Sequence, residues 1–192
     1  FSAIKEELVE DCPGLFRLAN NSSKTLFILG TELSSIKKHR DRVRRVHLLL
    51  FAPSIEAVLK FNQRLAARGI NITADGRPII GMTCKDILSL ALEIDEGMMM
   101  IPAHAWTPWF GVFGSNGGYD SLEECFEELT PHIRAIETGL SSDPLMNWRW
   151  SKLDNIALIS NSDSHSLERI GREANIFNTD LSYKGIVEAI KS

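Results

Sequence analysis

The stretch VRRVHLLLFAPSIEAVLKFNQRLAARG, residues 43–69, decides the fold class. Residues 43–52 are rich in Val, Leu and Phe, a composition typical of a buried strand. Residues 54–69 carry apolar side chains at helical spacing, begin at the helix-capping residue Ser54 and end at Gly69. Because a strand followed directly by a helix is a βα unit, this stretch predicts an α/β protein.

The same alternation of strand-length and helix-length patterns continues along the chain. It predicts further strands at 24–30, 98–105, 132–138, 156–160 and 174–178, a turn at 74–81, and further helices at 83–97, capped by Thr83, at 120–130 and at 182–191. Such alternation predicts a mainly parallel sheet, either closed as a barrel or open and doubly wound. No glycine-rich phosphate loop follows any of these strands, which disfavours the open nucleotide-binding form. We expect residues 1–192 to form a single domain.

The overall charge does not indicate a nucleic-acid-binding protein, since the 192 residues carry a net charge of −4. Positive charge is nevertheless concentrated in KKHRDRVRR, residues 37–45, where six Lys or Arg residues accompany one Asp. This run predicts either a solvated loop or exposed strand, or a patch that contacts phosphates.

Cysteine spacing and hydropathy bear on the compartment. Cys12, Cys84 and Cys125 are far apart and form no Cys-x-x-Cys pair, which disfavours a disulfide framework and a structural zinc site. No apolar run approaches the roughly 20 residues that a membrane-spanning helix needs. We therefore expect a cytoplasmic protein with no membrane association, and the sequence identifies no protein partner.

Carboxylates and imidazoles recur where the predicted strands end. They are Glu32, His104, Glu137, Asp163 and His165, and His47 joins them within or at the start of its strand. Asp163 and His165, two residues apart, point the same way if the chain is still extended there. Taken singly, each has a structural explanation: a lone histidine is usually a hydrogen-bonded core residue, and SNSDSHS at 160–166 has the composition of a helix-capping turn. Together they match a multinuclear metal site, because imidazole and carboxylate suit zinc, manganese or iron. With no Gly-x-Ser-x-Gly nucleophile motif present, the expected chemistry is attack by a metal-activated water.

The order Glu…His…His…Asp-x-His resembles the later motifs of the PHP (polymerase and histidinol phosphatase) phosphoesterase superfamily. Within it, GTELSS, VRRVHLLLFAPS, DGRPIIGMTCKDIL, IPAHAWTPWFGVFGSNGGYDSLEEC, AIETGLSSDPLMNWRWSKLD and SNSDSHSLERIGREANIF are similar to the endonuclease Q group over nearly the whole chain. The resemblance implies a PHP-type distorted (β/α)7 barrel. It also implies two or three divalent metals, with Zn, Mn or Fe as candidates and Mg as a further one. The implied partner is DNA, cleaved on the 5′ side of deaminated bases (deoxyuridine, deoxyinosine) or abasic sites.

Carried over to this sequence, the resemblance implies five metal ligands, namely Glu32, His47, His104, Asp163 and His165. It implies catalytic roles for Asp163 and His104. Glu137 has no counterpart among the family's usual ligands, and we expect it, with Asn161, to support the ligands from behind. The family's first-strand His-x-His, its Asp/His turn and its Cys-rich zinc tail are not found in the 192 residues. We therefore expect an incomplete barrel that binds metal weakly and is inactive in isolation.

Two further segments are candidates for contacts with substrate. Trp106, Trp109 and Phe110 either stack on a flipped base or form a hydrophobic cap. A second set either reads a base edge and holds a phosphate or belongs to an ordinary turn, and consists of Ser141, Ser142, Asn147 and Arg149. The competing functions are a small-molecule phosphoesterase of the histidinol-phosphatase type and a non-catalytic module that binds DNA or a partner.

Overall fold

The computed structural model describes residues 5–20, 22–73 and 76–191, and it confirms the mixed α/β class. A six-stranded sheet has the order β1-β2-β3-β4-β6, with β5 paired to β3. Its strands are β1 (Leu8–Cys12), β2 (Leu15–Leu18), β3 (Phe27–His39), β4 (Arg42–Ala52), β5 (Ile79–Ile80) and β6 (Met99–Pro102). A separate two-stranded sheet contains β7 (Ala135–Glu137) and β8 (Ala157–Ile159).

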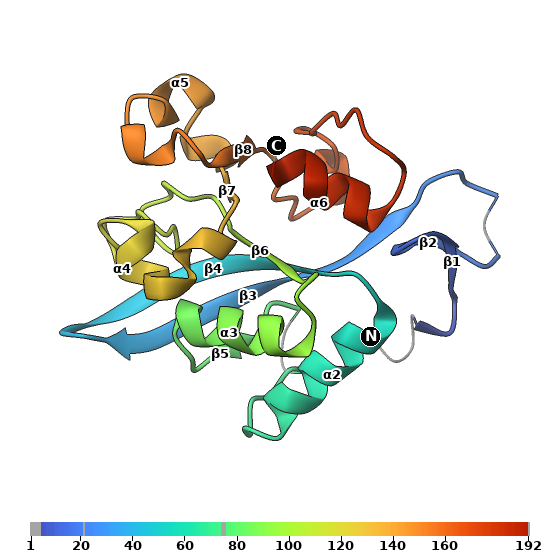
Figure 1. Cartoon of the computed structure of the whole chain (residues 1–192), viewed down its shortest axis with the longest axis horizontal. Coiled ribbons are helices and arrows are strands. Elements are labelled where there is room, and N and C mark those ends of the chain that lie inside the picture. The colour runs from blue at the N-terminus through green and yellow to red at the C-terminus, as the bar shows by residue number, and fades with distance from the viewer. Residues whose placement is uncertain (1–4, 21, 74–75, 192) are drawn as a thin grey trace.

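The prediction of a mainly parallel sheet is wrong. Only Arg40 and Asp41 separate β3 from β4, and so short a connection can join only antiparallel neighbours. Pairing is parallel between β3 and β5 and between β7 and β8, and antiparallel elsewhere in the two sheets. The basic run at 37–45 forms the tip of the long β3–β4 hairpin (Figure 1). Among the described residues the strands form two separate sheets and do not close into a barrel.

The predicted helices are present, with shorter bounds than their patterns suggest. They are α2 (Ile55–Ala66), α3 (Cys84–Ile94), α4 (Leu122–Phe126), continued by a 3-10 segment (Glu127–His132), and α6 (Tyr183–Lys191), beside a short α5 (Pro144–Asn147). The Ser54 hydroxyl accepts a hydrogen bond from the Ala57 N–H, and the Thr83 hydroxyl accepts one from the Asp86 N–H. Both predicted N-caps are therefore confirmed. The turn predicted at 74–81 lies partly outside the described residues.

The strand predicted at 174–178 is wrong. The Asn175 amide accepts a hydrogen bond from the Ser160 N–H at 2.8 Å and donates one to the Ser160 carbonyl at 2.9 Å. Ile176 next to it is 99% exposed, so the apolar side chains of this segment are not buried in the hydrophobic core. The side chain of Asn175 therefore takes hydrogen bonds at the end of β8 that a neighbouring strand's backbone would otherwise take.

The β3–β4 hairpin is buried on both faces, which explains the unbroken apolar run at 48–52. Leu48 and Leu50 belong to the large hydrophobic cluster that includes residues of α2 and α3. Leu49 and Phe51 pack instead against a smaller cluster that includes Ile101, Ile159 and residues of α6. Figure 1 shows the corresponding layers, with α2 and α3 on one side of the sheet and α6, β7 and β8 on the other. Side chains that alternate along β4 thus enter two different layers.

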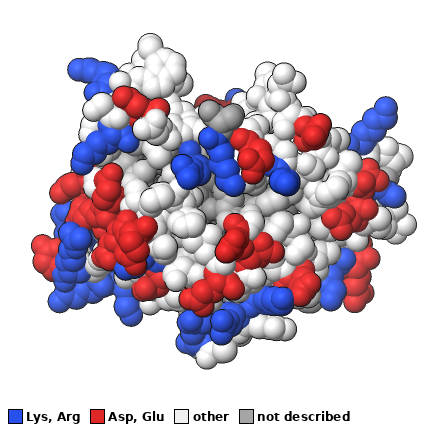
Figure 2. All heavy atoms as spheres, in the orientation of Figure 1, with Lys and Arg blue, Asp and Glu red and all other residues white. Residues whose placement is uncertain are grey.

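Charge is mixed on one face of the molecule. The face in Figure 2 carries acidic and basic side chains side by side, with uncharged surface between them, and shows no uniformly basic area. None of the described helices combines the length and the apolar character needed to cross a membrane.

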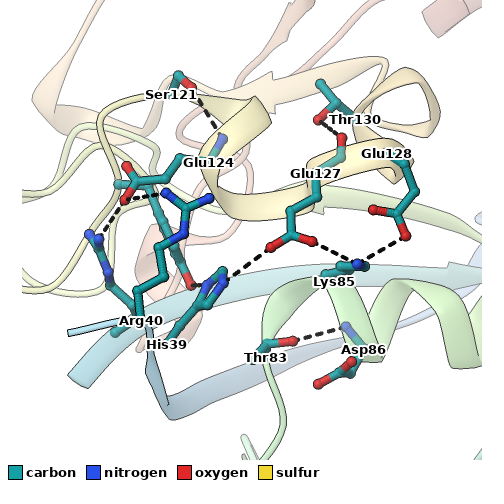
Figure 3. Close-up of polar contacts among 12 residues, drawn as sticks. His39, Arg40, Thr83, Lys85, Asp86, Ser121, Glu124, Glu127, Glu128 and Thr130 are labelled. Atoms are coloured by element: carbon teal, nitrogen blue, oxygen red, sulfur yellow. Dashed lines mark hydrogen bonds and ion pairs between the residues drawn. The ribbon is translucent and has the colours of Figure 1, made fainter. Parts of the chain in front are cut away.

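Polar contacts connect the hairpin tip to helices that lie beside it (Figure 3). His39 Nε2 lies 3.3 Å from Glu127 Oε1, and Lys85 Nζ lies 2.7 Å from Glu127 Oε2 and 2.9 Å from Glu128 Oε1. The hydrogen bonds from Lys85 to Glu127 and Glu128 raise the pKa of Lys85 to about 12. His39, a member of the basic run at 37–45, therefore contacts another side chain of the protein. The sequence had predicted a solvated loop, an exposed strand or a patch that contacts phosphates.

Arg44 is the buried member of this run and gives a test of the hairpin's packing. It is 3% exposed, donates hydrogen bonds to the Gly118 carbonyl and to Glu124 Oε1, and lies 4.3 Å from the centroid of the Tyr119 ring. We predict that Arg44→Ala lowers the free energy of unfolding by about 3 kcal/mol, because it leaves the carboxylate and carbonyl without their buried partner. Exposed Arg42 on the same strand is the matched control, and Arg42→Ala should change stability by less than about 0.5 kcal/mol. Equal urea midpoints for the two variants would contradict this role.

Candidate metal centre

The register of the β3–β4 hairpin brings Glu32 and His47 to one face. Glu32 lies opposite Leu49, and His47 lies opposite Ser34. Because side chains alternate along a strand, residues 47 and 49 point to the same face as Glu32, which makes Glu32 and His47 diagonal neighbours. Glu32 was predicted just past the end of its strand, but it lies inside β3, whereas His47 lies within its strand, one of the two places predicted for it. Antiparallel pairing, and not a shared sheet edge, brings them together.

His104 reaches the same place from the exit of β6, where the sequence placed it. The Ala103 N–H donates to the His47 carbonyl at 3.0 Å and so extends the β4–β6 pairing by one step beyond β6. His104 then adopts a φ of 31°, in the left-handed region that a residue with a β-carbon rarely occupies. This turn directs the imidazole toward Glu32 and His47.

Three donor atoms from these residues form a compact triangle. Glu32 Oε1 lies 3.1 Å from His47 Nδ1 and 3.5 Å from His104 Nε2, and the two nitrogens are 3.1 Å apart. An ion bound tetrahedrally through bonds of about 2.0–2.1 Å holds its ligand atoms about 3.3 Å apart. Glu32 Oε1 is buried, and no donor among the described residues meets it with hydrogen-bond geometry. The spacing and the unmatched oxygen therefore fit a metal ion held by one carboxylate and two imidazoles.

Arg77 was missed by the sequence reasoning, although it lies in one of the stretches that carry the resemblance. Its guanidinium donates to Glu32 Oε2 at 3.2 Å, which leaves Oε1 toward the histidines. Burial by itself would raise the pKa of Glu32, but contacts with His104 and His47 and the charge of Arg77 hold it well below its ordinary value. The carboxylate is thus kept ionised. No local pattern could have paired residues 32 and 77, because β5 alone brings them together.

The two histidines differ in their electrostatics. Burial lowers the pKa of His47, and its contact with Glu32 offsets this only in part. Burial would lower the pKa of His104 too, but its contact with Glu32 and the charges of Glu32 and Glu137 raise it above the ordinary value. His47 therefore favours the neutral form that can coordinate a metal, whereas at His104 a proton competes more strongly with a metal.

The segment at 105–120 covers one side of this triad. The His47 N–H donates to the Phe110 carbonyl at 2.9 Å, and the Phe110 ring stacks on the His47 imidazole with centroids 4.2 Å apart. Trp106 is not free to stack on a base, since it packs against Phe113 and Trp150. Trp109, in contrast, is 55% exposed. The hydrophobic-cap interpretation thus describes Trp106 and Phe110, while Trp109 keeps the predicted substrate role.

The second predicted substrate segment is partly occupied by internal bonds. Asn147 is fully buried and accepts a hydrogen bond from Trp106 Nε1 at 2.8 Å, while its amide donates to Ser142 Oγ and to the Asp143 carbonyl. For Asn147, the predicted contact with a base would require these bonds to break. Arg149 and Ser141 are exposed, although Ser141 Oγ lies 3.2 Å from the Thr107 hydroxyl.

Glu137 and Asn161, predicted to lie behind the ligands, are in contact with each other and with the ligand segment. Glu137 Oε2 accepts the His104 N–H at 2.7 Å, and Oε1 accepts the Asn161 amide at 2.8 Å. Burial raises the pKa of Glu137, the nearby charge of Asp163 adds to this, and both hydrogen bonds oppose it.

Asp163 and His165 are not part of the triad. Among the described residues, the group whose ligand atoms all lie within 4.8 Å of one another is Glu32, His47 and His104. Asp163 has a φ of 43°, so the extended backbone on which its pairing with His165 was predicted is absent. His165 is exposed and its Nδ1–H donates to the Asp163 carbonyl at 2.9 Å. Their roles as ligands remain predictions.

The fold and the triad define a mixed α/β protein with a candidate Glu–His–His metal centre. Its structure is similar to that of the lesion-specific endonuclease PfuEndoQ from Pyrococcus furiosus, with a TM-score of 0.81 and 30% identity over 99% of this chain and 44% of that chain. Endonuclease Q in complex with a 27-mer duplex substrate carrying an abasic lesion at the active site is similar to the same extent, with a TM-score of 0.82 and 30% identity over the same shares. The predicted resemblance to endonuclease Q is thereby confirmed.

The curated proteins include relatives as well. The uncharacterized protein YqxK of Bacillus subtilis is 35% identical over 152 residues, which make up 79% of this chain and 37% of YqxK. No protein-family model matches the chain. The chain spans less than half the length of YqxK and of the endonuclease Q structures.

The triad makes a direct prediction about metal binding. Glu32→Ala and His104→Ala should each weaken Zn²⁺ binding by more than about 100-fold, because even groups behind a metal's ligands usually contribute about 10–100-fold. The measurement is isothermal titration calorimetry on the purified chain. His132→Ala is the matched control, since His132 is exposed and outside the triad, and it should bind Zn²⁺ as the parent chain does. A loss shared equally by all three variants would contradict the assignment.

Gly139 gives a second, steric test of how His104 is placed. It has a φ of 60°, and a Cβ at this position would lie 2.7 Å from the His104 Cβ and 2.9 Å from its Cα. We predict that Gly139→Ala weakens Zn²⁺ binding, because His104 must move. Gly171, with a φ of 73° and no atom within 4 Å of such a Cβ, is the matched control. Gly171→Ala carries the same backbone penalty of about 1–2 kcal/mol but should leave Zn²⁺ affinity unchanged.

Proposed function

We propose that this chain carries part of the active site of a metal-dependent DNA repair endonuclease. The enzyme hydrolyses the phosphodiester on the 5′ side of deaminated bases or abasic sites. The observation that carries the proposal is the Glu32–His47–His104 triad, found in a chain whose structure follows endonuclease Q over 99% of its length. The finer fold assignment, a PHP-type distorted (β/α)7 barrel, belongs to the same proposal.

In this proposal Glu32, His47 and His104 hold one divalent ion, with Zn, Mn or Fe as the fitting candidates. Asp163 and His165 complete a site for two or three ions. A bound ion supplies Lewis acidity toward the phosphate and a water of lowered pKa. Arg77 keeps the Glu32 carboxylate ionised and oriented. Asp163 accepts a hydrogen bond from the attacking water and aligns it with the phosphate.

The remaining candidates bind the substrate. Lys37, Lys38 and Arg42 are exposed near the hairpin tip and contact DNA phosphates, whereas Arg44 is committed to the core. Trp109 stacks on a base at the lesion, with Phe110 behind it holding His47. Exposed Ser141 and Arg149 reach the base edge and the backbone, with Ser142 beside them. On the face that Figure 2 shows, acidic and basic side chains are mixed, which fits local phosphate contacts there.

The test is cleavage, by the natural protein that carries this chain, of end-labelled duplexes that contain one deoxyuridine, one deoxyinosine or one abasic site, because this chain in isolation is expected to be inactive. We predict a nick on the 5′ side of the lesion, and a rate that falls by at least about 100-fold, or about 2.7 kcal/mol, in Asp163→Asn. Exposed Asp154 is the control, and Asp154→Asn should cut at the parent rate. Full activity of Asp163→Asn would sink the mechanism, and faster hydrolysis of a phosphate monoester than of lesion DNA would favour a small-molecule phosphoesterase.

A further inference from the structure

We propose that Glu137 is a positioning residue that fixes His104 relative to the segment that carries Asp163. The inference rests on the metal centre proposed above, but it does not depend on DNA being the substrate. Glu137 is the last residue of β7, and its side chain lies between the exit of β6 and the exit of β8. It therefore touches the two segments whose relative placement decides whether Asp163 can act with the triad.

Both oxygens of one buried carboxylate are used. Glu137 is 3% exposed, its Oε2 accepts the His104 N–H at 2.7 Å and its Oε1 accepts the Asn161 amide at 2.8 Å. Only an ionised carboxylate accepts hydrogen bonds on both oxygens without also donating one. We call this pair of hydrogen bonds, which joins the His104 backbone to the Asn161 side chain, the Glu137 clamp. Asn161 lies two residues before Asp163, so the clamp reaches close to this predicted metal ligand.

The Asn161 end of the clamp is itself held in place by hydrogen bonds. Asn161 Oδ1 accepts a hydrogen bond from the Asn175 amide at 3.1 Å. That amide also donates to the Ser160 carbonyl, and Asn175 Oδ1 accepts the Ser160 N–H. The Asn161 side chain is thus held in the orientation that points its amide hydrogens at Glu137. The segment leading to Asp163 has no regular secondary structure, and these side-chain bonds take its place.

The near side of the clamp holds a strained residue. His104 has a φ of 31°, a conformation that costs free energy and persists only where the surroundings enforce it. Two groups of Glu137 hold this conformation. Its carboxylate accepts a hydrogen bond from the His104 N–H, and its backbone carbonyl accepts one from the Ala105 N–H at 2.8 Å. Gly139 leaves room for the His104 Cα and Cβ on the same side. The imidazole is placed by backbone contacts, and its Nε2 remains free for the triad.

A role as a metal ligand fits the geometry less well. The compact group of donor atoms among the described residues contains Glu32, His47 and His104 without Glu137. Both carboxylate oxygens of Glu137 already face N–H donors, and those donors belong to the protein's own framework. A positioning role uses all of these contacts as they stand.

The test is a swap of hydrogen-bonding groups. Glu137→Gln replaces one of the two accepting oxygens by an NH₂ group, which cannot accept from the second donor. Adding Asn161→Asp reverses that contact: the glutamine NH₂ then donates to the new carboxylate, whose other oxygen still accepts from Asn175. The double variant therefore restores the number of bonds while the carboxylate sits at a different position. A metal-ligating or proton-transferring carboxylate at position 137 would not be replaced in this way.

The first readout is Co²⁺ binding, monitored through the visible absorption spectrum of the bound ion. We expect Glu137→Gln to raise the Kd for Co²⁺ by about 10–100-fold and to change the band pattern, as is usual when a group behind a ligand is removed. The double variant should recover at least about tenfold of that loss and the parent spectrum. Exposed Glu168 is the control, and Glu168→Gln should bind Co²⁺ like the parent chain. An unchanged Kd in Glu137→Gln, or a double variant no better than the single one, would overturn the proposal.

The second readout needs no metal, so it separates this inference from the proposed activity. In metal-free protein, amide hydrogen exchange at His104 and Ser160 should speed up by about tenfold in Glu137→Gln, the effect of losing one hydrogen bond to a charged group. The double variant should slow it again, and exchange within α2 should not change. Equal exchange in parent and single variant would overturn the clamp even if lesion DNA were cut, whereas a rescued pattern would support it even if no DNA were cut.

Discussion

The antiparallel register between β3 and β4 is the constraint on which the candidate metal centre depends. A slip of one residue in a strand moves every side chain to the opposite face of the sheet. In the observed register Leu33 and Leu48 enter the large core, while Glu32 and His47 enter the smaller layer beside α6. A slipped β3 would bury the Glu32 carboxylate among the leucines and expel Leu33. Burial of the large core and assembly of the triad are therefore enforced by one and the same pairing.

Placing a carboxylate and two imidazoles in that layer is costly, because burial disfavours charge. Part of the cost is offset by Arg77, by the contact between the two imidazoles and by the stacked Phe110. The offset is incomplete, since Glu32 Oε1 and His104 Nδ1 are buried without a hydrogen-bond partner among the described residues. Buried polar atoms are usually satisfied, and exceptions tend to mark function. A cation would satisfy Glu32 Oε1 in a way that no neighbouring side chain does.

The sequence predicted the features that depend on residues close together along the chain. The N-caps at Ser54 and Thr83 and the apolar strand at 43–52 are local signals, and they are confirmed. Residue type, position relative to the predicted strands and the resemblance to the PHP motifs together singled out the three triad members. The hairpin was missed because its turn, Arg40 and Asp41, lacks the Asn-Gly or Gly chemistry that marks tight turns, although Arg40 takes a φ of 57°. The supposed strand at 174–178 has strand composition but exposed side chains, and composition cannot report burial.

The long-range parts of the site lay beyond the sequence for the same reason. Arg77 meets Glu32 through the pairing of β5 with β3, and Asn175 meets Ser160 across a segment whose regular structure is one short 3-10 turn, Leu167–Arg169. Asp163 and His165 were matched by a rule for extended chains, and the φ of 43° at Asp163 removes its premise. Spacing in the sequence predicts which side chains share a face only while the backbone keeps its regular geometry.

The division of the hydrophobic residues into two clusters has a consequence for cooperativity. The large cluster ties α2 and α3 to the sheet, whereas the smaller one holds α6, β7 and β8 with far fewer buried side chains. The smaller layer should open with a lower free energy than the rest of the chain, as less densely buried units do. The triad and the Glu137 clamp lie where this layer meets the sheet, so an ion bound there would hold the two units together. By mass action, a higher metal concentration would then lower the fraction of molecules in which this smaller layer is open.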